Sequence, residues 1–163
     1  PDRPLVVVMG GAKVEDKLPL LQLLVQRADT ILVGGKLANE LAVNNEQLTG
    51  RARVVLPVEG GSLLDIGEET RKIFTAEIAK AKTVVWNGPM GKVEDPQYRA
   101  GTEAIYEAMV ANEQAFTLVG GGDTLAAIGK EEHLSRIDHV STGGGAMLAL
   151  LEKGTLPGLR VLQ

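Results

Sequence analysis

The chain has 163 residues, of which 44% are hydrophobic and 23% charged, a balance that suits one folded domain and excludes extended disorder. Its formal net charge is -4 and no basic run exceeds two residues, which argues against a nucleic-acid binder that works by bulk charge. The sequence has no cysteine and no apolar stretch long enough to span a membrane, which excludes thiolate metal sites and predicts a soluble, cytoplasmic protein.

The first part of the chain alternates strand-like and helix-like segments. Residues 5–9 form a continuous apolar run that is typical of a buried strand, and apolar side chains then recur at helical spacing over residues 18–27. Residues 31–33 predict the next strand, 36–43 the next helix and 53–56 a third strand. This order predicts repeated strand-helix-strand units.

The second part of the chain continues the alternation. Residues 68–82 predict an amphipathic helix with acidic residues in its first turn and lysines in its last, an order that suits the helix dipole. The remaining segments, in chain order, are a strand over 83–86, a helix over 102–111, a strand over 115–119, a helix over 124–130 and two closing segments over 137–140 and 145–152. Near-continuous apolar strands that alternate with helices predict an α/β fold whose doubly wound parallel sheet is covered on both faces.

Five of the strand-like runs end at a cluster of glycines. The clusters lie at residues 10–11, 34–35, 87–89, 120–122 and 143–145. Glycine tolerates positive φ and has no Cβ, so such turns can bring backbone N–H groups close to a ligand, which is how proteins often hold phosphate. Because the carboxyl ends of parallel strands share one edge of a sheet, we expect these turns to gather at one ligand site.

The standard phosphate-binding fingerprints are absent. No G-x-x-x-x-G-K-[ST] occurs, and a G-x-G-x-x-G that begins at Gly120 fails because Leu125 stands where a glycine is required. Other residues near the turns still suit a phosphate ligand. Lys13 and Lys17 follow the first turn and offer cations, while Asp123 in the fourth turn offers a hard oxygen ligand to Mg²⁺.

Each of these residues also has an ordinary structural explanation. Lys13 and Lys17 could form a solvated face beside acidic neighbours, Asp123 could cap a helix, and Glu94 could belong to a polar loop. A glycine pair such as 34–35 is often only a tight turn, whereas three glycines in a row would cost about 1 kcal/mol each in regular structure and need a reason. A nucleotide-binding or structural module without catalysis, and an NAD-type Rossmann domain, therefore stay open as alternatives.

Four motifs stand in one order along nearly the whole chain. They are GGAKV at residues 10–14 with Lys17, VWNGPMG at 85–91, GGGDT at 120–124, and VSTGGGA at 140–146 followed by LPG at 156–158. In this combination the chain resembles the phosphoglycerate kinase family, specifically its C-terminal, nucleotide-binding domain. The resemblance implies a magnesium-dependent glycolytic kinase that moves a phosphoryl group between 1,3-bisphosphoglycerate and ADP, giving 3-phosphoglycerate and ATP. It also implies a three-layer, Rossmann-like core with six parallel strands.

The resemblance further implies roles for individual residues. Lys17, with Lys13 nearby, would contact the transferring phosphoryl group, where fixed cations and backbone amides do most of the catalysis. Asp123 would hold Mg²⁺, Glu94 would bind the ribose, and Leu64 would line the adenine slot. The implied catalytic residues are Lys13, Lys17, Gly122 and Gly144. The implied nucleotide contacts are Gly11, Ala12, Gly34, Gly35, Leu64, Asn87, Pro89, Glu94, Gly120, Gly121, Gly122, Asp123 and Thr124.

The chain also departs from the family pattern. Residues 43–63 form only a short bridge where the family usually has a helix and a small β excursion. Lys36 stands where a third glycine is common, and Lys92-Val93 stands where a Val-Phe pair usually precedes the glutamate. The family's N-terminal domain, with its arginine-rich phosphoglycerate site, is absent from these residues. We therefore expect residues 1–163 to be a single monomeric domain that binds Mg²⁺ with ADP or ATP. It should meet 3-phosphoglycerate or 1,3-bisphosphoglycerate only with that second domain, and should not turn over alone.

Overall fold

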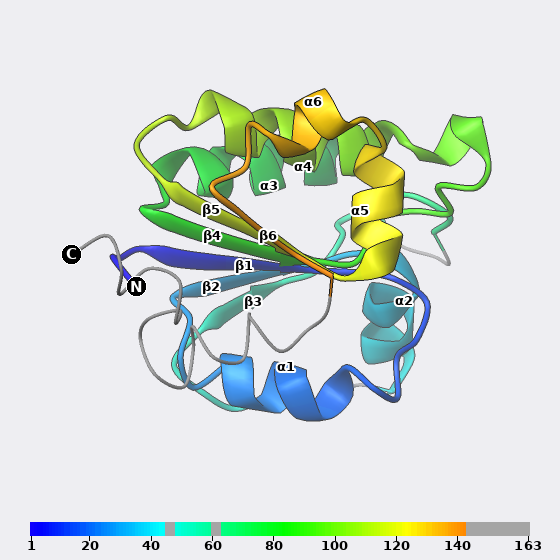
Figure 1. Cartoon of the computed structure of the whole chain (residues 1–163). Coiled ribbons are helices and arrows are strands. Elements are labelled where there is room, and N and C mark those ends of the chain that lie inside the picture. The colour runs from blue at the N-terminus through cyan, green and yellow to red at the C-terminus, as the bar shows by residue number, and fades with distance from the viewer. Residues whose placement is uncertain (45–47, 60–62, 143–163) are drawn as a thin grey trace.

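The computed structural model describes residues 1–44, 48–59 and 63–142, which build one sheet between two layers of helices (Figure 1). The strands are β1 (Leu5–Met9), β2 (Thr30–Val33), β3 (Arg53–Val55), β4 (Thr83–Asn87), β5 (Phe116–Gly120) and β6 (His139–Ser141). Neighbouring strands all pair in parallel, in the order β3-β2-β1-β4-β5-β6. The predicted doubly wound, six-stranded parallel α/β fold is therefore confirmed.

The helices cover both faces of the sheet, as Figure 1 shows. One face carries α1 (Leu18–Leu24) and α2 (Gly35–Asn44), and the other carries α3 (Glu68–Lys80), α4 (Ala100–Ala111) and α6 (Glu131–Leu134). The short helix α5 (Gly122–Ile128) follows β5 directly, at the edge where the strands end. A single 3-10 turn, η1 (Pro96–Tyr98), precedes α4. Among the described residues, no helix combines the length and the apolar character that crossing a membrane requires.

Each face of the sheet has its own apolar core, because successive side chains of a strand point to opposite faces. In β1, Leu5, Val7 and Met9 pack in the cluster that contains the buried side chains of α1 and α2. Val6 and Val8 pack in the other cluster, with the buried side chains of α3 and α4. Because the side chains of β1 are buried on both faces of the sheet, all five of its residues are apolar.

Several helix ends differ from the sequence-based expectation by a few residues. The helix predicted over 18–27 ends at Leu24. The helix predicted over 68–82 ends at Lys80, because the backbone N–H of Lys82 already donates to the Pro4 carbonyl at 2.9 Å, which lies just before β1. Helix ends are therefore set partly by contacts that no local pattern reveals.

The last elements differ in a similar way. The helix predicted over 124–130 is α5, which begins two residues earlier at Gly122 and ends at Ile128. The next residue, Gly129, has a φ of +84°, a conformation that favours glycine. The short helix α6 was not predicted. The closing segment expected over 137–140 contains the start of strand β6, which begins at His139, and the segment expected over 145–152 lies outside the described residues.

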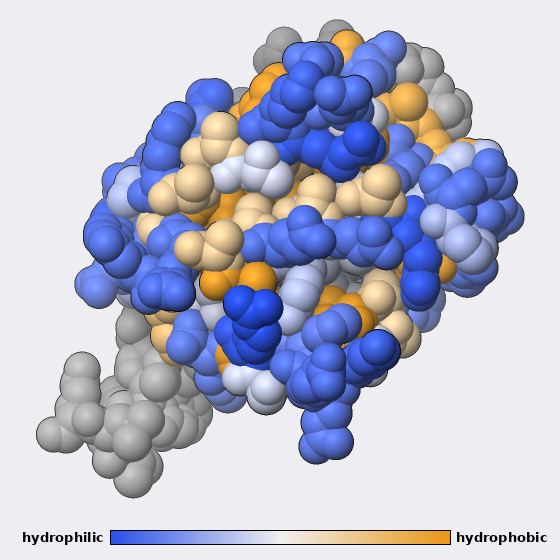
Figure 2. Space-filling model, turned by 90° about the horizontal axis from the view of Figure 1, so that it is seen from above, coloured by the Kyte–Doolittle hydropathy of each residue, from blue (hydrophilic) through white to orange (hydrophobic). Residues whose placement is uncertain are grey.

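The outer surface of the α3 and α4 layer is mostly hydrophilic, as the view from above in Figure 2 shows. On α3, the exposed Lys72 lies 3.0 Å from a carboxylate oxygen of Glu68 and 2.8 Å from one of Glu69. Exposed ion pairs of this kind contribute little to stability. The layer is held instead by its inner side chains, among which Phe74 and Ile78 are fully buried against the sheet.

The edge strand β6 is anchored to β5 by Asp138. A carboxylate oxygen of Asp138 accepts hydrogen bonds from the Thr117 backbone N–H at 2.8 Å and from the Thr117 hydroxyl at 2.7 Å. Hydrogen bonds to a charged group contribute about 1.5–3 kcal/mol, so Asp138→Ala should lower the free energy of unfolding in urea by about 2 kcal/mol. Glu132→Ala on the exposed surface of α6 should change it by less than about 0.5 kcal/mol, and equal losses would contradict the anchoring role.

Candidate functional site

Four of the five predicted glycine turns meet at the carboxyl edge of the sheet. The strand register places Met9 beside both Val33 and Asn87, and Asn87 beside Gly120, so the turns that follow these residues are neighbours. These turns lie at residues 10–11, 34–35, 87–89 and 120–122. The fifth turn, which contains Gly144, lies outside the described residues. The strand order reverses between β1 and β4, so the first and third turns flank the switch point where open α/β sheets bind ligands.

Backbone hydrogen bonds join the first turn to the third. The N–H of Gly10 donates to the Asn87 carbonyl at 2.9 Å, and the N–H of Gly11 donates to the Pro89 carbonyl at 2.8 Å. The third turn is also tied to the core, because the indole N–H of the buried Trp86 donates to the Gly88 carbonyl at 2.8 Å. The first and third turns are therefore hydrogen-bonded to each other, and the third is also hydrogen-bonded to the buried Trp86.

Thr124 connects the third turn to the fourth. Its side chain is fully buried, and its hydroxyl oxygen accepts a hydrogen bond from the Gly88 N–H at 2.7 Å. The hydroxyl proton is still free to be donated, but this contact gives Thr124 a bracing role that the motif did not predict. The amide of Asn87, by contrast, forms no hydrogen bond with any other side chain or backbone group in the described part of the chain.

Gly11 and Gly88 leave room for the ammonium of Lys17. Both glycines have positive φ, +94° and +96°, a conformation that other residues rarely adopt. The ammonium donates to the Gly10 carbonyl, and a Cβ added at Gly11 or Gly88 would collide with it. These two turns therefore require glycine both for their backbone conformation and for the position of Lys17.

Lys17 is held in a partly buried position that disfavours its charge. Burial lowers the pKa of Lys17, and the positive charge of Lys13 lowers it further, whereas the carboxylate of Asp123 raises it. The burial effect is the largest of the three. An ammonium that has lost part of its hydration in this way gains more from an anionic ligand than a fully solvated one does.

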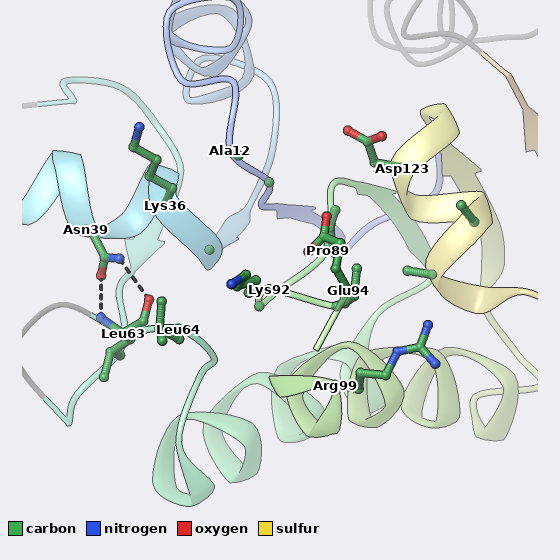
Figure 3. Close-up of a pocket in the computed structure, with 16 residues that line it drawn as sticks. Ala12, Lys36, Asn39, Leu63, Leu64, Pro89, Lys92, Glu94, Arg99 and Asp123 are labelled. Carbon is green, nitrogen blue, oxygen red and sulfur yellow. Dashed lines mark hydrogen bonds between the residues drawn. The ribbon is translucent and has the colours of Figure 1, made fainter. Parts of the chain in front are cut away.

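A cleft of about 520 Å³ opens at this edge between α2 and α5 (Figure 3). The predicted nucleotide contacts that line it are Gly11, Ala12, Gly35, Leu64, Pro89, Glu94 and Asp123. Those outside its lining are Gly34, Asn87, Gly120, Gly121, Gly122 and Thr124. Lys17 is also outside the lining, and Lys13 lines a smaller neighbouring hollow of about 260 Å³. The structure thus brings about half of the predicted contacts onto one concave surface.

Four polar residues that line the cleft were not among the predicted contacts: Lys36, Asn39, Lys92 and Arg99. Lys36 and Lys92 stood out in the sequence only as departures from the family pattern. The Asn39 amide is paired with the backbone of Leu63, donating to its carbonyl at 2.9 Å and accepting from its N–H at 3.1 Å (Figure 3). No local signal marks Asn39 or Arg99, because the packing of α2 and α4 brings them to the cleft.

Asp65 supports the part of the lining that contains Leu64. Its carboxylate accepts hydrogen bonds from the backbone N–H groups of Ile66 and Gly101, each at 2.9 Å, and so ties this segment to the start of α4. Burial raises the pKa of Asp65, and these two hydrogen bonds oppose the rise. Asp65 therefore has a positioning role that the sequence did not suggest.

The surroundings of Asp123 suit a metal ion that binds together with a nucleotide. They do not suit a metal ion that the protein holds by its own side chains. Its exposed carboxylate lines the cleft and makes no hydrogen bond or ion pair with another described residue. In the part of the chain that the structure describes, no group of three or more His, Cys, Asp or Glu side chains could hold a metal. Mg²⁺ is commonly held by one or two carboxylates together with nucleotide phosphates, which one carboxylate beside phosphate-binding turns would suit.

Comparison with known proteins connects this chain to one family. The family model for phosphoglycerate kinase matches residues 1–55 and 43–154. Curated phosphoglycerate kinases of Thermus thermophilus and Desulfosudis oleivorans are 41% and 39% identical over 208 aligned positions, covering 100% of this chain and 53% and 52% of those proteins. The chain thus spans about half the length of the curated relatives it matches.

Solved structures of phosphoglycerate kinases also match the chain. Phosphoglycerate kinase from Coxiella burnetii matches with a TM-score of 0.79 and 31% identity, over 100% of this chain and 54% of that one. The enzyme from Pyrococcus horikoshii matches with a TM-score of 0.74 and 30% identity, over 99% of this chain and 52% of that one.

The comparisons also bear on the short bridge at residues 43–63. The 208 aligned positions exceed the 163 residues of the chain, so the relatives carry residues inside the aligned region that this chain lacks. The two pieces of the family match overlap at residues 43–55, which places the interruption at the beginning of the bridge.

Proposed function

Because the chain belongs to the phosphoglycerate kinase family, we propose that it is the nucleotide-binding part of a kinase that transfers a phosphoryl group between 1,3-bisphosphoglycerate and ADP. The products of that glycolytic reaction are 3-phosphoglycerate and ATP. The observation that carries the proposal is the meeting of four glycine turns at the switch point of the sheet, with the Lys17 ammonium and the Asp123 carboxylate beside them. As part of the same proposal, the protein acts in the cytoplasm as a monomer.

The proposed roles follow from the charge and position of the side chains. Lys17, supported by Lys13, binds the phosphoryl group that is transferred, whose negative charge sits on oxygens that a fixed cation can stabilise. The backbone N–H of Gly122 donates to the nucleotide phosphates, as does that of Gly144 once the two family domains meet. The N–H of Gly121 instead donates to the Ser141 carbonyl at 3.2 Å, so Gly121 contributes through the shape of the turn. Asp123 holds Mg²⁺, which when bound neutralises charge on the phosphates and orients them.

The rest of the cleft is assigned to the nucleoside. Glu94 accepts hydrogen bonds from the ribose hydroxyls, and Gly35 and Leu64 contact the base. Residues 1–163 span about half the length of the curated relatives, so the proposal includes nucleotide binding without turnover by these residues alone. A non-catalytic binding module is the alternative, and it would share the nucleotide affinity without completing the reaction when supplied with the family's second domain.

Calorimetric titration of the chain with ADP in the presence of Mg²⁺ tests the proposal. We expect a dissociation constant below about 1 mM, in the range of ordinary enzyme–substrate affinities, and no measurable heat with NAD. NAD is the matched control because it carries the same adenosine and two phosphates but suits a different class of Rossmann domain. Absence of ADP binding, or tighter binding of NAD, would overturn the proposed function.

Removal of the Asp123 carboxylate tests the metal site. Asp123→Ala should weaken Mg·ADP about tenfold, the loss of one charge-assisted contact, while the affinity for ADP without Mg²⁺ changes less than about twofold. Asp2→Ala removes an exposed carboxylate that precedes β1, at the opposite edge of the sheet, and should leave both affinities unchanged. Equal losses with and without Mg²⁺ would count against metal binding by Asp123.

A further inference from the structure

The side chain of Met90 lies directly beneath the first and second glycine turns. Met90 is fully buried, although it directly follows the third turn at the ligand edge of the sheet. A Cβ added at Gly34 would come within 2.6 Å of the Met90 sulfur, and one added at Gly10 within 2.6 Å of its terminal methyl. Both separations are too short for a real Cβ, so the Met90 side chain fills the space that the two glycines leave. Met90 therefore packs against the backbone of two turns that follow different strands.

The backbone of Met90 also holds the second turn. The Met90 carbonyl accepts a hydrogen bond from the Gly35 N–H at 3.0 Å, and the Met90 N–H donates to the hydroxyl of the buried Thr102 at 3.0 Å. The second turn meets the first through a longer hydrogen bond, from the Leu37 N–H to the Gly11 carbonyl at 3.4 Å. Met90 thus connects the second turn to α4, which contains Thr102, and to the third turn, which Met90 follows in the chain.

The first, third and fourth turns are fastened to one another by hydrogen bonds that do not involve Met90. The N–H groups of Gly10 and Gly11 bond the first turn to the third, and the Thr124 hydroxyl bonds the third turn to the fourth. Glycine turns have no side chains of their own, so their separation depends on what packs beneath them. Beneath Gly34 in the second turn, that packing comes from Met90 and from Ile66, whose Cγ2 would lie 3.4 Å from an added Cβ.

From the side-chain packing and the backbone contacts together, we infer that Met90 is a positioning residue that sets the distance between the second turn and the other three. The second turn is assigned to the base and the others to the phosphates, so this distance fixes how well a nucleotide fits the cleft. A nucleotide spans both ends of the cleft, whereas pyrophosphate meets the phosphate turns alone, and sites of this kind lose affinity when their supporting side chains are loosened. This role rests on the proposed function, because it takes the glycine turns as the nucleotide site. It adds a buried residue that acts on the ligand through those turns.

Calorimetry of Met90→Ala with ADP and with pyrophosphate, each in the presence of Mg²⁺, tests the positioning role. Alanine removes the sulfur and the terminal methyl and leaves a cavity beneath the second turn. We expect the affinity for ADP to fall about tenfold and the affinity for pyrophosphate to change less than about threefold. An unchanged affinity for ADP, or equal losses for the two ligands, would overturn the role of Met90 and leave the proposed function intact. If the parent chain does not bind ADP, the proposed function fails and the role of Met90 fails with it.

Met109→Ala is the matched control for a loss of stability without a loss of position. Met109 is buried in the same apolar core as Met90 but lies in the last turn of α4, whereas Thr102 lies in the first. Urea denaturation should show that both alanine variants are destabilised, but Met109→Ala should keep its affinity for ADP within about twofold of the parent. If the two variants weaken ADP binding equally, the role of Met90 is refuted, whatever the result with pyrophosphate.

Two further variants at residue 90 separate the position of the turn from general damage to the core. Met90→Leu keeps most of the buried volume and should restore the affinity for ADP to within about threefold of the parent. Met90→Val lacks the sulfur and terminal methyl but leaves a smaller cavity, so it should weaken ADP about three- to tenfold and decides the result if Met90→Ala does not fold. Parent-like affinity in Met90→Val would contradict the positioning role, as would a loss in Met90→Leu as large as that in Met90→Val.

Discussion

Gly88→Ala is expected to lower the free energy of unfolding by about 4 kcal/mol, a large share of the stability of an ordinary domain. Gly88 is buried with φ at +96°, and an alanine there would be strained by about 1–3 kcal/mol from its backbone conformation alone. Its Cβ would also collide with the Gly10 carbonyl and with the Lys17 ammonium, and overpacking of this kind costs a further 1–3 kcal/mol or so. Urea denaturation followed by circular dichroism measures the loss.

Gly122→Ala is the matched control, because the same methyl group enters open space. No atom lies within 4 Å of a Cβ added at Gly122, which is the first residue of α5 and has no positive φ. Alanine is the better helix former, so this variant should be more stable than the parent by up to about 1 kcal/mol. If Gly88→Ala were no more destabilising than Gly122→Ala, the close contact between the first and third turns would be refuted.

Lys17→Met should weaken the binding of Mg·ADP by about 100-fold, while the free energy of unfolding at pH 7 changes by no more than about 1 kcal/mol. Methionine keeps most of the length of the side chain but removes the ammonium that would meet the phosphates. The lost hydrogen bond to the Gly10 carbonyl is offset by relief of the unfavourable burial of charge. Lys82→Met is the control variant. Lys82 is an exposed residue that lies just before β4 and contacts Gln114, so its replacement should not change the affinity for Mg·ADP.

The pH dependence of stability gives a second readout for Lys17. Burial lowers its pKa in the folded state below the ordinary value of 10.5, so the unfolded chain holds this proton more tightly. The penalty for the buried charge is therefore complete below the folded pKa and disappears as the pH rises toward 10.5. The stability of Lys17→Met relative to the parent should fall over that range. A pH-independent difference, or an unchanged affinity for Mg·ADP, would remove Lys17 from the proposed phosphate site.

The layered α/β fold could be predicted from the sequence because its signals are local. The unbroken apolar run of β1 reports burial on both faces, and the glycines at residues 10–11 and 120–122 mark where strands turn into helices. The same glycine motifs, together with Lys17 and Asp123, were enough to suggest the family. Local patterns of this kind determine which elements form and which chemistry lies at their ends.

The sequence alone left open how those ends are joined. The strand order, with its reversal between β1 and β4, depends on crossovers that carry no local signal. The bond from Gly88 to Thr124 joins residues 36 apart in the chain, and so does the bond from Gly101 to Asp65. A pattern within one segment cannot reveal contacts at that separation, which is why the bracing roles of Thr124 and Asp65 were not predicted.

Contacts between distant segments also decide which residues line the cleft. The sequence by itself determined the alternation of apolar strands with helices, the glycine turns and the charged residues beside them, since each depends on spacing within one short segment. Only the tertiary structure decided that Asn39 is paired with Leu63, and that Lys92 and Arg99 line the cleft. Those outcomes depend on the packing of α2 and α4 around the sheet, because the walls of a cleft come from segments that meet only after the chain has folded.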